Sequence, residues 1–113
     1  MSKISAHVLD TARGRPAADL TVRLEVLEQD GSYRELGRAR TDTDGRIADL
    51  LAGQPLEMRT YRVLFETEAY LVATQQEVFY PRVEVVFRVR APREGHHIPL
   101  LLSPFGYSTY RGS

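Results

Sequence analysis

Apolar and polar residues alternate along most of the chain, which is the pattern of β-strands with one buried face. The clearest example puts Leu20, Val22, Leu24 and Val26 on one side of a strand and polar residues on the other. Comparable strands are expected at residues 4–8, 33–41, 58–66, 83–89, 97–102 and 106–110, with a short apolar piece at 47–51. Seven or eight short strands at regular spacing predict an all-β, antiparallel β-sandwich.

Turn residues separate these strands. Asp30-Gly31 indicates a hairpin, and the polar return strand after it is typical of a sheet edge. Asp42-Thr43-Asp44-Gly45 predicts a second turn, which delivers Arg46 at its exit. Helical periodicity is confined to residues 67–76, where Thr67 is the expected cap and Glu68 suits the positive end of the helix dipole.

The composition narrows the class of protein. A chain of 113 residues fits a single domain, residues 1–113, with a core modest enough that oligomerisation is a plausible source of stability. Its 15 basic and 15 acidic residues cancel, which argues against nucleic acid or an anionic membrane as the main partner. There is no cysteine and no apolar run near the length of a membrane span. The N-terminus lacks a signal-peptide pattern, so we expect either a cytoplasmic location or a protein whose signal peptide has been removed.

Three residues are candidates for chemistry. His7 and His97 lie on the faces of their strands opposite the apolar residues, so both should point outward with Arg46. Each alone could be an ordinary solvated side chain. Together they suggest a site, because imidazoles transfer protons near neutral pH and guanidinium binds planar, oxygen-rich ligands or a developing oxyanion.

Other kinds of site fit the sequence less well. The Asp42–Gly45 turn lacks the later ligands of a calcium loop. His96 and His97 are adjacent on a strand and point to opposite faces, which disfavours a shared metal. No serine of the C-terminal segment lies in a nucleophile elbow, and no phosphate-binding glycine pattern occurs. Tyr107 and Tyr110 could simply be core or interface aromatics.

Three segments together resemble a known family. They are the start His7-Val8-Leu9-Asp10-Thr11, the turn Thr41-Asp42-Thr43-Asp44-Gly45-Arg46, and the end from Pro99 to Ser113. The chain is similar throughout to the 5-hydroxyisourate hydrolases, the transthyretin-like proteins of purine catabolism. The closing Tyr110-Arg111-Gly112-Ser113 is the most specific part of the resemblance, because it distinguishes the hydrolases from the hormone-carrying transthyretins.

The resemblance implies a transthyretin-like sandwich of two four-stranded sheets with one short helix. It further implies a homotetramer with its sites at the dimer–dimer interface, and no metal or organic cofactor. The implied reaction opens a cyclic amide of the small-molecule substrate 5-hydroxyisourate and yields 2-oxo-4-hydroxy-4-carboxy-5-ureidoimidazoline. The family often has His-Tyr-His before its Ile/Val-Pro pair, whereas this chain has Gly95-His96-His97.

Carried onto this sequence, the resemblance assigns catalysis to His7, Arg46, His97 and Ser113, and substrate binding to His7, Arg46, Tyr110, Arg111 and Gly112. The two histidines would activate water and deliver a proton, in an order that the sequence leaves open. Arg46 would grip substrate oxygens, Tyr110 would orient the ring, and Ser113 would position the water or a histidine. Two other classes remain: a non-catalytic transthyretin-like carrier of a flat aromatic ligand, and an immunoglobulin-like interaction domain.

Overall fold

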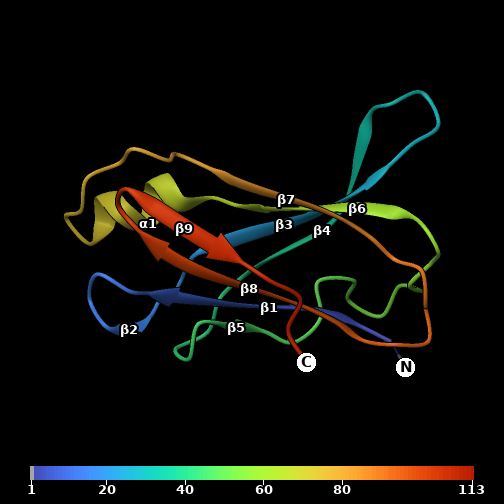
Figure 1. The fold of residues 1–113 in the computed structure, drawn as a ribbon, viewed down its shortest axis with the longest axis horizontal. Helices are drawn as coiled ribbons and strands as arrows, with labels where there is room; N and C mark the ends of the chain where they lie inside the picture. Colours follow the sequence, from blue (N-terminus) through green and yellow to red (C-terminus); the bar gives the residue numbers. More distant parts are fainter. Residues whose placement is uncertain (1) are drawn as a thin grey trace.

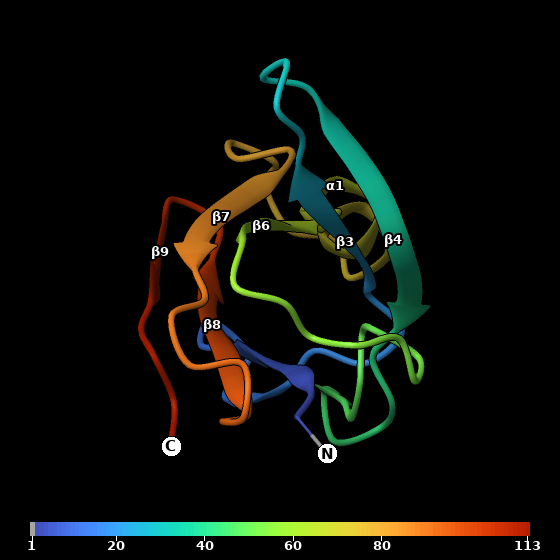
Figure 2. The same ribbon diagram turned by 90° about the vertical axis from the view of Figure 1, so that its right-hand side faces the viewer.

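Two β-sheets pack face to face in the computed structural model, which describes residues 2–113 (Figures 1 and 2). The first sheet has the order β2-β1-β8-β9, and β5 also pairs with β1. Its strands are β1 (Ile4–Asp10), β2 (Arg15–Pro16), β5 (Arg46–Ile47), β8 (His96–Ser103) and β9 (Gly106–Thr109). The second sheet has the order β4-β3-β6-β7. Its strands are β3 (Thr21–Leu27), β4 (Tyr33–Arg40), β6 (Thr60–Phe65) and β7 (Val83–Arg88).

The predicted sandwich is confirmed, but two details of the prediction are wrong. The first sheet has five strands rather than four, because the two-residue strands β2 and β5 both pair with β1. The sheet is also mixed: β1 and β8 run parallel over seven residue pairs, from Ile4↔His96 to Asp10↔Leu102. A parallel pair needs a long crossover, and here the whole second sheet and the helix lie between the two strands in sequence.

Period-two alternation produces the core, as predicted. Ile4, Ala6 and Val8 on β1 and Leu100 and Leu102 on β8 are buried against the apolar face of the second sheet. The polar positions between them face away from the core, so β1 presents Ser5 and His7 on the outer side of its sheet. Strand β4 is mostly exposed or half-buried at the edge of its sheet, which agrees with its weak pattern.

The single helix within residues 2–113 is α1 (Thr67–Ala73), three residues shorter than expected. The prediction that Thr67 caps it is wrong: Glu66 occupies the cap position and makes no side-chain capping bond. Thr67 is instead buried and donates its hydroxyl to the Tyr80 carbonyl at 2.6 Å. This bond ties the start of the helix to the segment that leads into β7, so a tertiary hydrogen bond rather than a local cap holds the helix there.

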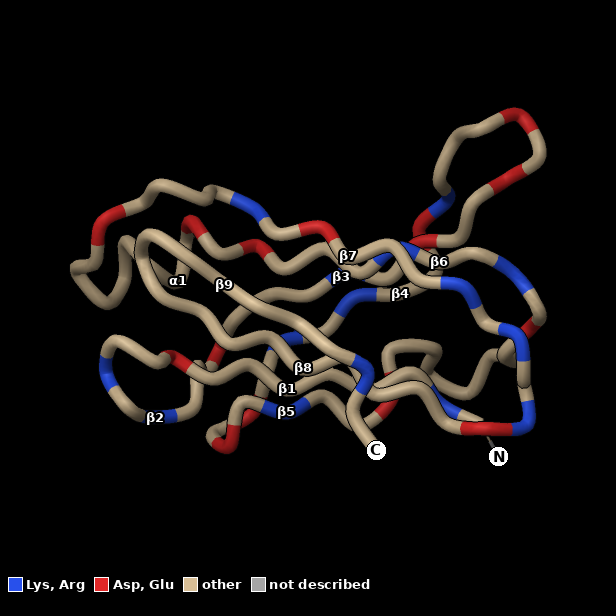
Figure 3. The backbone as a smooth tube through the Cα atoms, viewed as in Figure 1, with Lys and Arg blue, Asp and Glu red and all other residues tan. Residues whose placement is uncertain are grey.

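Charged residues are distributed unevenly over the two sheets (Figure 3). The outer face of the second sheet carries ion pairs such as Arg62–Glu25 at 2.6 Å and Arg23–Glu66 at 3.1 Å. The β8–β9 hairpin has no Asp, Glu, Lys or Arg from residue 96 to residue 110. No helix in the described part of the chain is long and apolar enough to cross a membrane.

Candidate active site

The turn at residues 42–45 brings Arg46 beside His7. The Asp42 carboxylate accepts the backbone N–H groups of Asp44 and Arg46, each at 2.9 Å, so the aspartate organises its own turn. Gly45 has φ +75° and a Cβ there would strike the Val8 carbonyl, so glycine is needed at this position. The chain then enters β5, in which Arg46 pairs in register with His7 of β1. The predicted turn and its delivery of Arg46 are confirmed.

The parallel pairing of β1 and β8 brings the second histidine to the same place. His97 lies opposite Ser5 in the register of these strands, and its ring centroid is 6.4 Å from that of His7. The Ser5 hydroxyl and the His97 Nδ1 are 2.8 Å apart. His7 bonds through Nε2 to the Asp44 carbonyl at 3.0 Å, and since a carbonyl only accepts, this nitrogen carries the proton.

The C-terminal tail completes a hollow of about 390 Å³ that Ser5 and His97 line. Gly112 forms a bridge to His97 and donates its backbone N–H to the His97 carbonyl at 2.9 Å. Any Cβ on Gly112 would collide with the His97 ring, so the tail can only lie this close because the residue is glycine. The bridge carries Ser113 into the wall of the hollow. The lining is Ser5, Ala6, Asp42, Arg46, Ile47, Ala48, His97 and Ser113.

The electrostatics favour a neutral imidazole at His97. Burial lowers the pKa of His97 below its ordinary value, and the nearby His7 and Arg46 lower that pKa further. Arg46 itself is exposed, and within residues 2–113 its guanidinium has no acidic partner. The hollow therefore combines an imidazole that can accept a proton with a guanidinium available to an anionic or carbonyl oxygen.

Tyr110 and Arg111 lie outside the hollow that Arg46, His97 and Ser113 line. Both line a separate, mostly apolar hollow of about 210 Å³ with Phe87 and His96, and Arg111 pairs with Glu94 at 3.0 Å. His96, at the position where the family often has tyrosine, is buried, stacks near Phe87 and bonds through Nδ1 to the Glu94 carbonyl. One chain thus brings Arg46, His97 and Ser113 to one hollow, with His7 and Gly112 beside them. It leaves Tyr110 and Arg111 outside that hollow.

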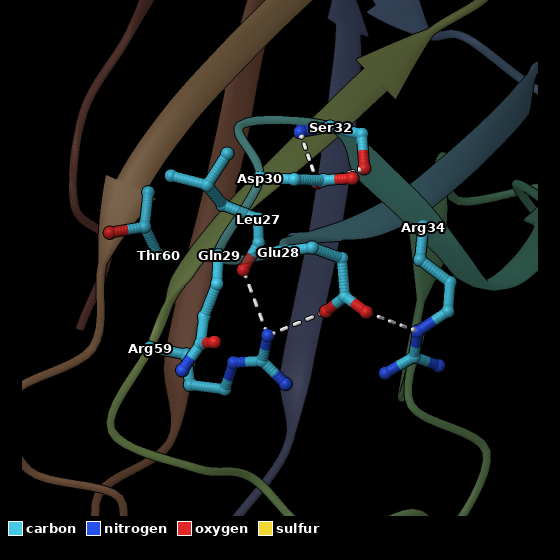
Figure 4. A pocket seen from close by; sticks show the side chains of 8 residues that line it. All are labelled: Leu27, Glu28, Gln29, Asp30, Ser32, Arg34, Arg59 and Thr60. Carbon is cyan, nitrogen blue, oxygen red and sulfur yellow. Dashed lines mark hydrogen bonds and ion pairs between the residues drawn. The ribbon is translucent and has the colours of Figure 1, made fainter.

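Neither a metal site nor a second, wider hollow offers a better candidate for an active site. Within residues 2–113 no three His, Asp or Glu side chains gather as metal ligands, and His96 and His97 face opposite sides of β8. A wider hollow lies at the base of the β3–β4 hairpin (Figure 4). There the Glu28 carboxylate already accepts from Arg59 at 2.6 Å and from Arg34 at 3.3 Å. Those groups are occupied with one another, so this hollow is an ion-pair network rather than a reactive site.

Ser5 is the residue that the sequence did not single out. The alternation placed Ser5 and His7 on one face of β1, which was the available signal. Its partner could not be foreseen, because His97 is 92 residues away and reaches Ser5 only through the parallel pairing of β1 with β8.

Comparison with known proteins agrees with the architecture. A family model described as "HIUase/Transthyretin family" matches residues 4–112. A 5-hydroxyisourate hydrolase from Mus musculus is 46% identical over 113 residues, with 99% of this chain and 96% of the relative covered. The solved structure of Klebsiella pneumoniae 5-hydroxyisourate hydrolase has a TM-score of 0.87 at 34% identity, and all of both chains is covered. Sea bream transthyretin in complex with thyroxine has a TM-score of 0.90 at 30% identity, over 96% of this chain and 93% of that one.

Proposed function

Since the chain belongs to the HIUase/transthyretin family, we propose that it is a hydrolase that opens the cyclic amide of 5-hydroxyisourate in urate degradation. The product is 2-oxo-4-hydroxy-4-carboxy-5-ureidoimidazoline. The observation that carries the proposal is the convergence of Arg46, His97 and Ser113 on one hollow, with the His7 ring 6.4 Å from that of His97. Its volume suits a small, flat and polar heterocycle.

The reaction follows from the chemistry of these groups. His97, whose lowered pKa keeps it neutral at pH 7, accepts a proton from water as the water oxygen attacks the ring carbonyl. The Arg46 guanidinium holds substrate oxygens and stabilises the tetrahedral oxyanion. The ring C–N bond then breaks as the leaving nitrogen takes the proton from the His97 imidazolium, which returns to the neutral ring. His7, whose ring centroid is 6.4 Å from that of His97, is the second imidazole beside the reacting groups. The Ser113 hydroxyl or terminal carboxylate orients the water or a histidine from the wall of the hollow.

We further propose that four copies of the chain assemble, with their sites at an interface between dimers. The β8–β9 hairpin supports this, because it is uncharged from residue 96 to residue 110 and exposes Phe105 and Tyr107. Tyr110 and Arg111 also lie outside the hollow of their own chain, so in an assembly they are available to a neighbouring site. A mass measurement by light scattering tests this, and a monomer at micromolar concentration would refute it. The cytoplasmic location stays a prediction.

The competing function is a carrier, since a thyroxine complex of sea bream transthyretin shares the fold. Loss of 5-hydroxyisourate absorbance, followed on freshly generated substrate, separates the two. The full chain should accelerate this loss, while a chain that ends at Thr109 and a His97→Asn variant should be strongly impaired. We expect about two to four orders of magnitude lower turnover for His97→Asn, the usual contribution of acid–base catalysis. A full-length tetramer without activity would support the carrier.

A further inference from the structure

A side-chain hydrogen bond links the two central strands of the first sheet beneath the candidate site. Ser5 of β1 and His97 of β8 are register partners, and the Ser5 Oγ lies 2.8 Å from the His97 Nδ1. Ser5 is half-buried and lines the same hollow as Arg46 and Ser113. Within residues 2–113 this is the one side-chain hydrogen bond of Ser5, so the hydroxyl is committed to the imidazole.

The His97 ring is held on two sides. Ser5 occupies Nδ1, and the backbone of Gly112 packs so closely against the ring that a Cβ would lie 3.1 Å from Cγ and closer still to Cδ2. Rotation of the ring would break the bond to Ser5 or push the tail away. The remaining nitrogen, Nε2, is the one left for a reactant.

We propose that Ser5 is a positioning residue of the hydrolytic site: it accepts the Nδ1–H of His97 and so places the proton-accepting lone pair on Nε2. This inference rests on the proposed function. The same bond serves both protonation states, because Nδ1 carries a hydrogen in the neutral ring and in the imidazolium that forms when water loses its proton. Ser5 thereby fixes the tautomer before the reaction and stabilises the charge during it.

A pH experiment on this bond has to separate the effect of the Ser5 hydroxyl from the effects of the other charged and titratable groups around His97. The His7 ring of β1 is 6.4 Å from the His97 ring, Arg46 comes from β5, Asp42 from the preceding turn, and the terminal carboxylate of Ser113 from the tail. None of these groups is altered by changes at Ser5. A shift in the titration of His97 in a Ser5 variant therefore reports the hydroxyl itself.

The test compares Ser5→Ala with Ser5→Thr, which keeps a hydroxyl on a β-branched side chain suited to a strand. Ring-nitrogen NMR of the ¹⁵N-labelled assembly without substrate gives the tautomer and pKa of His97. We expect the Nδ1–H tautomer in the wild type, a mixture with a lower pKa in Ser5→Ala, and recovery in Ser5→Thr. For Ser5→Ala we expect kcat to fall about tenfold at unchanged KM, the rate equivalent of one hydrogen bond.

Ser32→Ala is the matched control, because it removes a serine hydroxyl that bonds Asp30 in the β3–β4 hairpin, away from the hollow. Thermal unfolding confirms that each variant is folded. An unchanged His97 tautomer and pKa in Ser5→Ala would overturn the inference, whatever the activity. A changed tautomer in a protein that never hydrolyses 5-hydroxyisourate would support the contact and count against the proposed function alone.

Discussion

Replacing Gly112 with alanine tests whether the C-terminal tail builds the site by packing against His97. The backbone of Gly112 bridges to His97, and a Cβ at this position would overlap the ring. Non-bonded carbons sit at about 3.5–4.0 Å, so the ring or the tail has to move by roughly 1 Å. Gly112 has no positive φ, so the added methyl acts through this contact and not through backbone strain.

The expected effects on activity and stability differ in size. Displacing a reacting group by about 1 Å can cost about 10²-fold in rate, so kcat/KM for 5-hydroxyisourate should fall by roughly that factor. The folded state should lose little more than the Gly112–His97 backbone hydrogen bond. This corresponds to about 1 kcal/mol in the free energy of unfolding, or roughly 4 °C in Tm. The tail lies at the end of the chain and its loss exposes little of the core.

The assay is the loss of substrate absorbance, run beside a thermal unfolding curve. Gly95→Ala is the matched control, since a Cβ there meets only the Lys3 carbonyl at 3.9 Å, an ordinary contact, and it should retain full activity. Wild-type turnover in Gly112→Ala would refute the reasoning, because it would mean that the close approach of the tail to His97 is dispensable. An equal loss of turnover in Gly112→Ala and Gly95→Ala would also refute the reasoning.

Two further predictions concern stability. The pKa of His97 in the folded protein lies below its ordinary value of 6.5. As the pH falls from about 6.5, the unfolded chain therefore binds a proton before the folded protein does, and the free energy of unfolding declines until the pH has passed the folded pKa. His97→Gln should remove this decline, which urea unfolding measured between about pH 7.5 and about pH 5 would show. The prediction is contradicted if the free energy of unfolding depends on pH in the same way in the variant and the wild type. Burial alone would raise the pKa of Asp10, but bonds from Tyr70, Arg13 and Gln76 outweigh burial and lower it. Tyr70→Phe, which deletes a 2.6 Å bond to this buried carboxylate, should cost about 1.5–3 kcal/mol at pH 7 and less as pH falls through the folded pKa of Asp10.

Local sequence patterns predicted the structure correctly wherever the feature lies within one strand or one turn. The alternation along β1, β3 and β8 gave the buried faces, and it placed His7 and His97 on the sides away from the core. The Asp42–Gly45 turn was predictable for the same reason, because its aspartate and glycine act within a few residues of one another. Thr67 shows the limit of such signals: its sequence position suggests a cap, but its hydroxyl bonds the Tyr80 carbonyl across a loop.

Contacts between distant segments required the tertiary structure. No local pattern indicates that β1 and β8 run parallel, and that pairing alone sets Ser5 against His97. The tail is the second case. Its last four residues appear in the sequence as one unit, yet the structure separates Ser113, at the hollow with Arg46 and His97, from Tyr110 and Arg111 near Phe87. The separation arises because Gly112 bridges to β8 and fixes the path of the chain on either side of it.

The sequence by itself therefore determined the sandwich and the candidate site residues, since period-two alternation and residue chemistry are local properties. The tertiary structure decided which of those groups meet. Strand register is set by the packing of a whole buried face, and a shift of one residue would turn His97 away from His7 and Ser5 into the core.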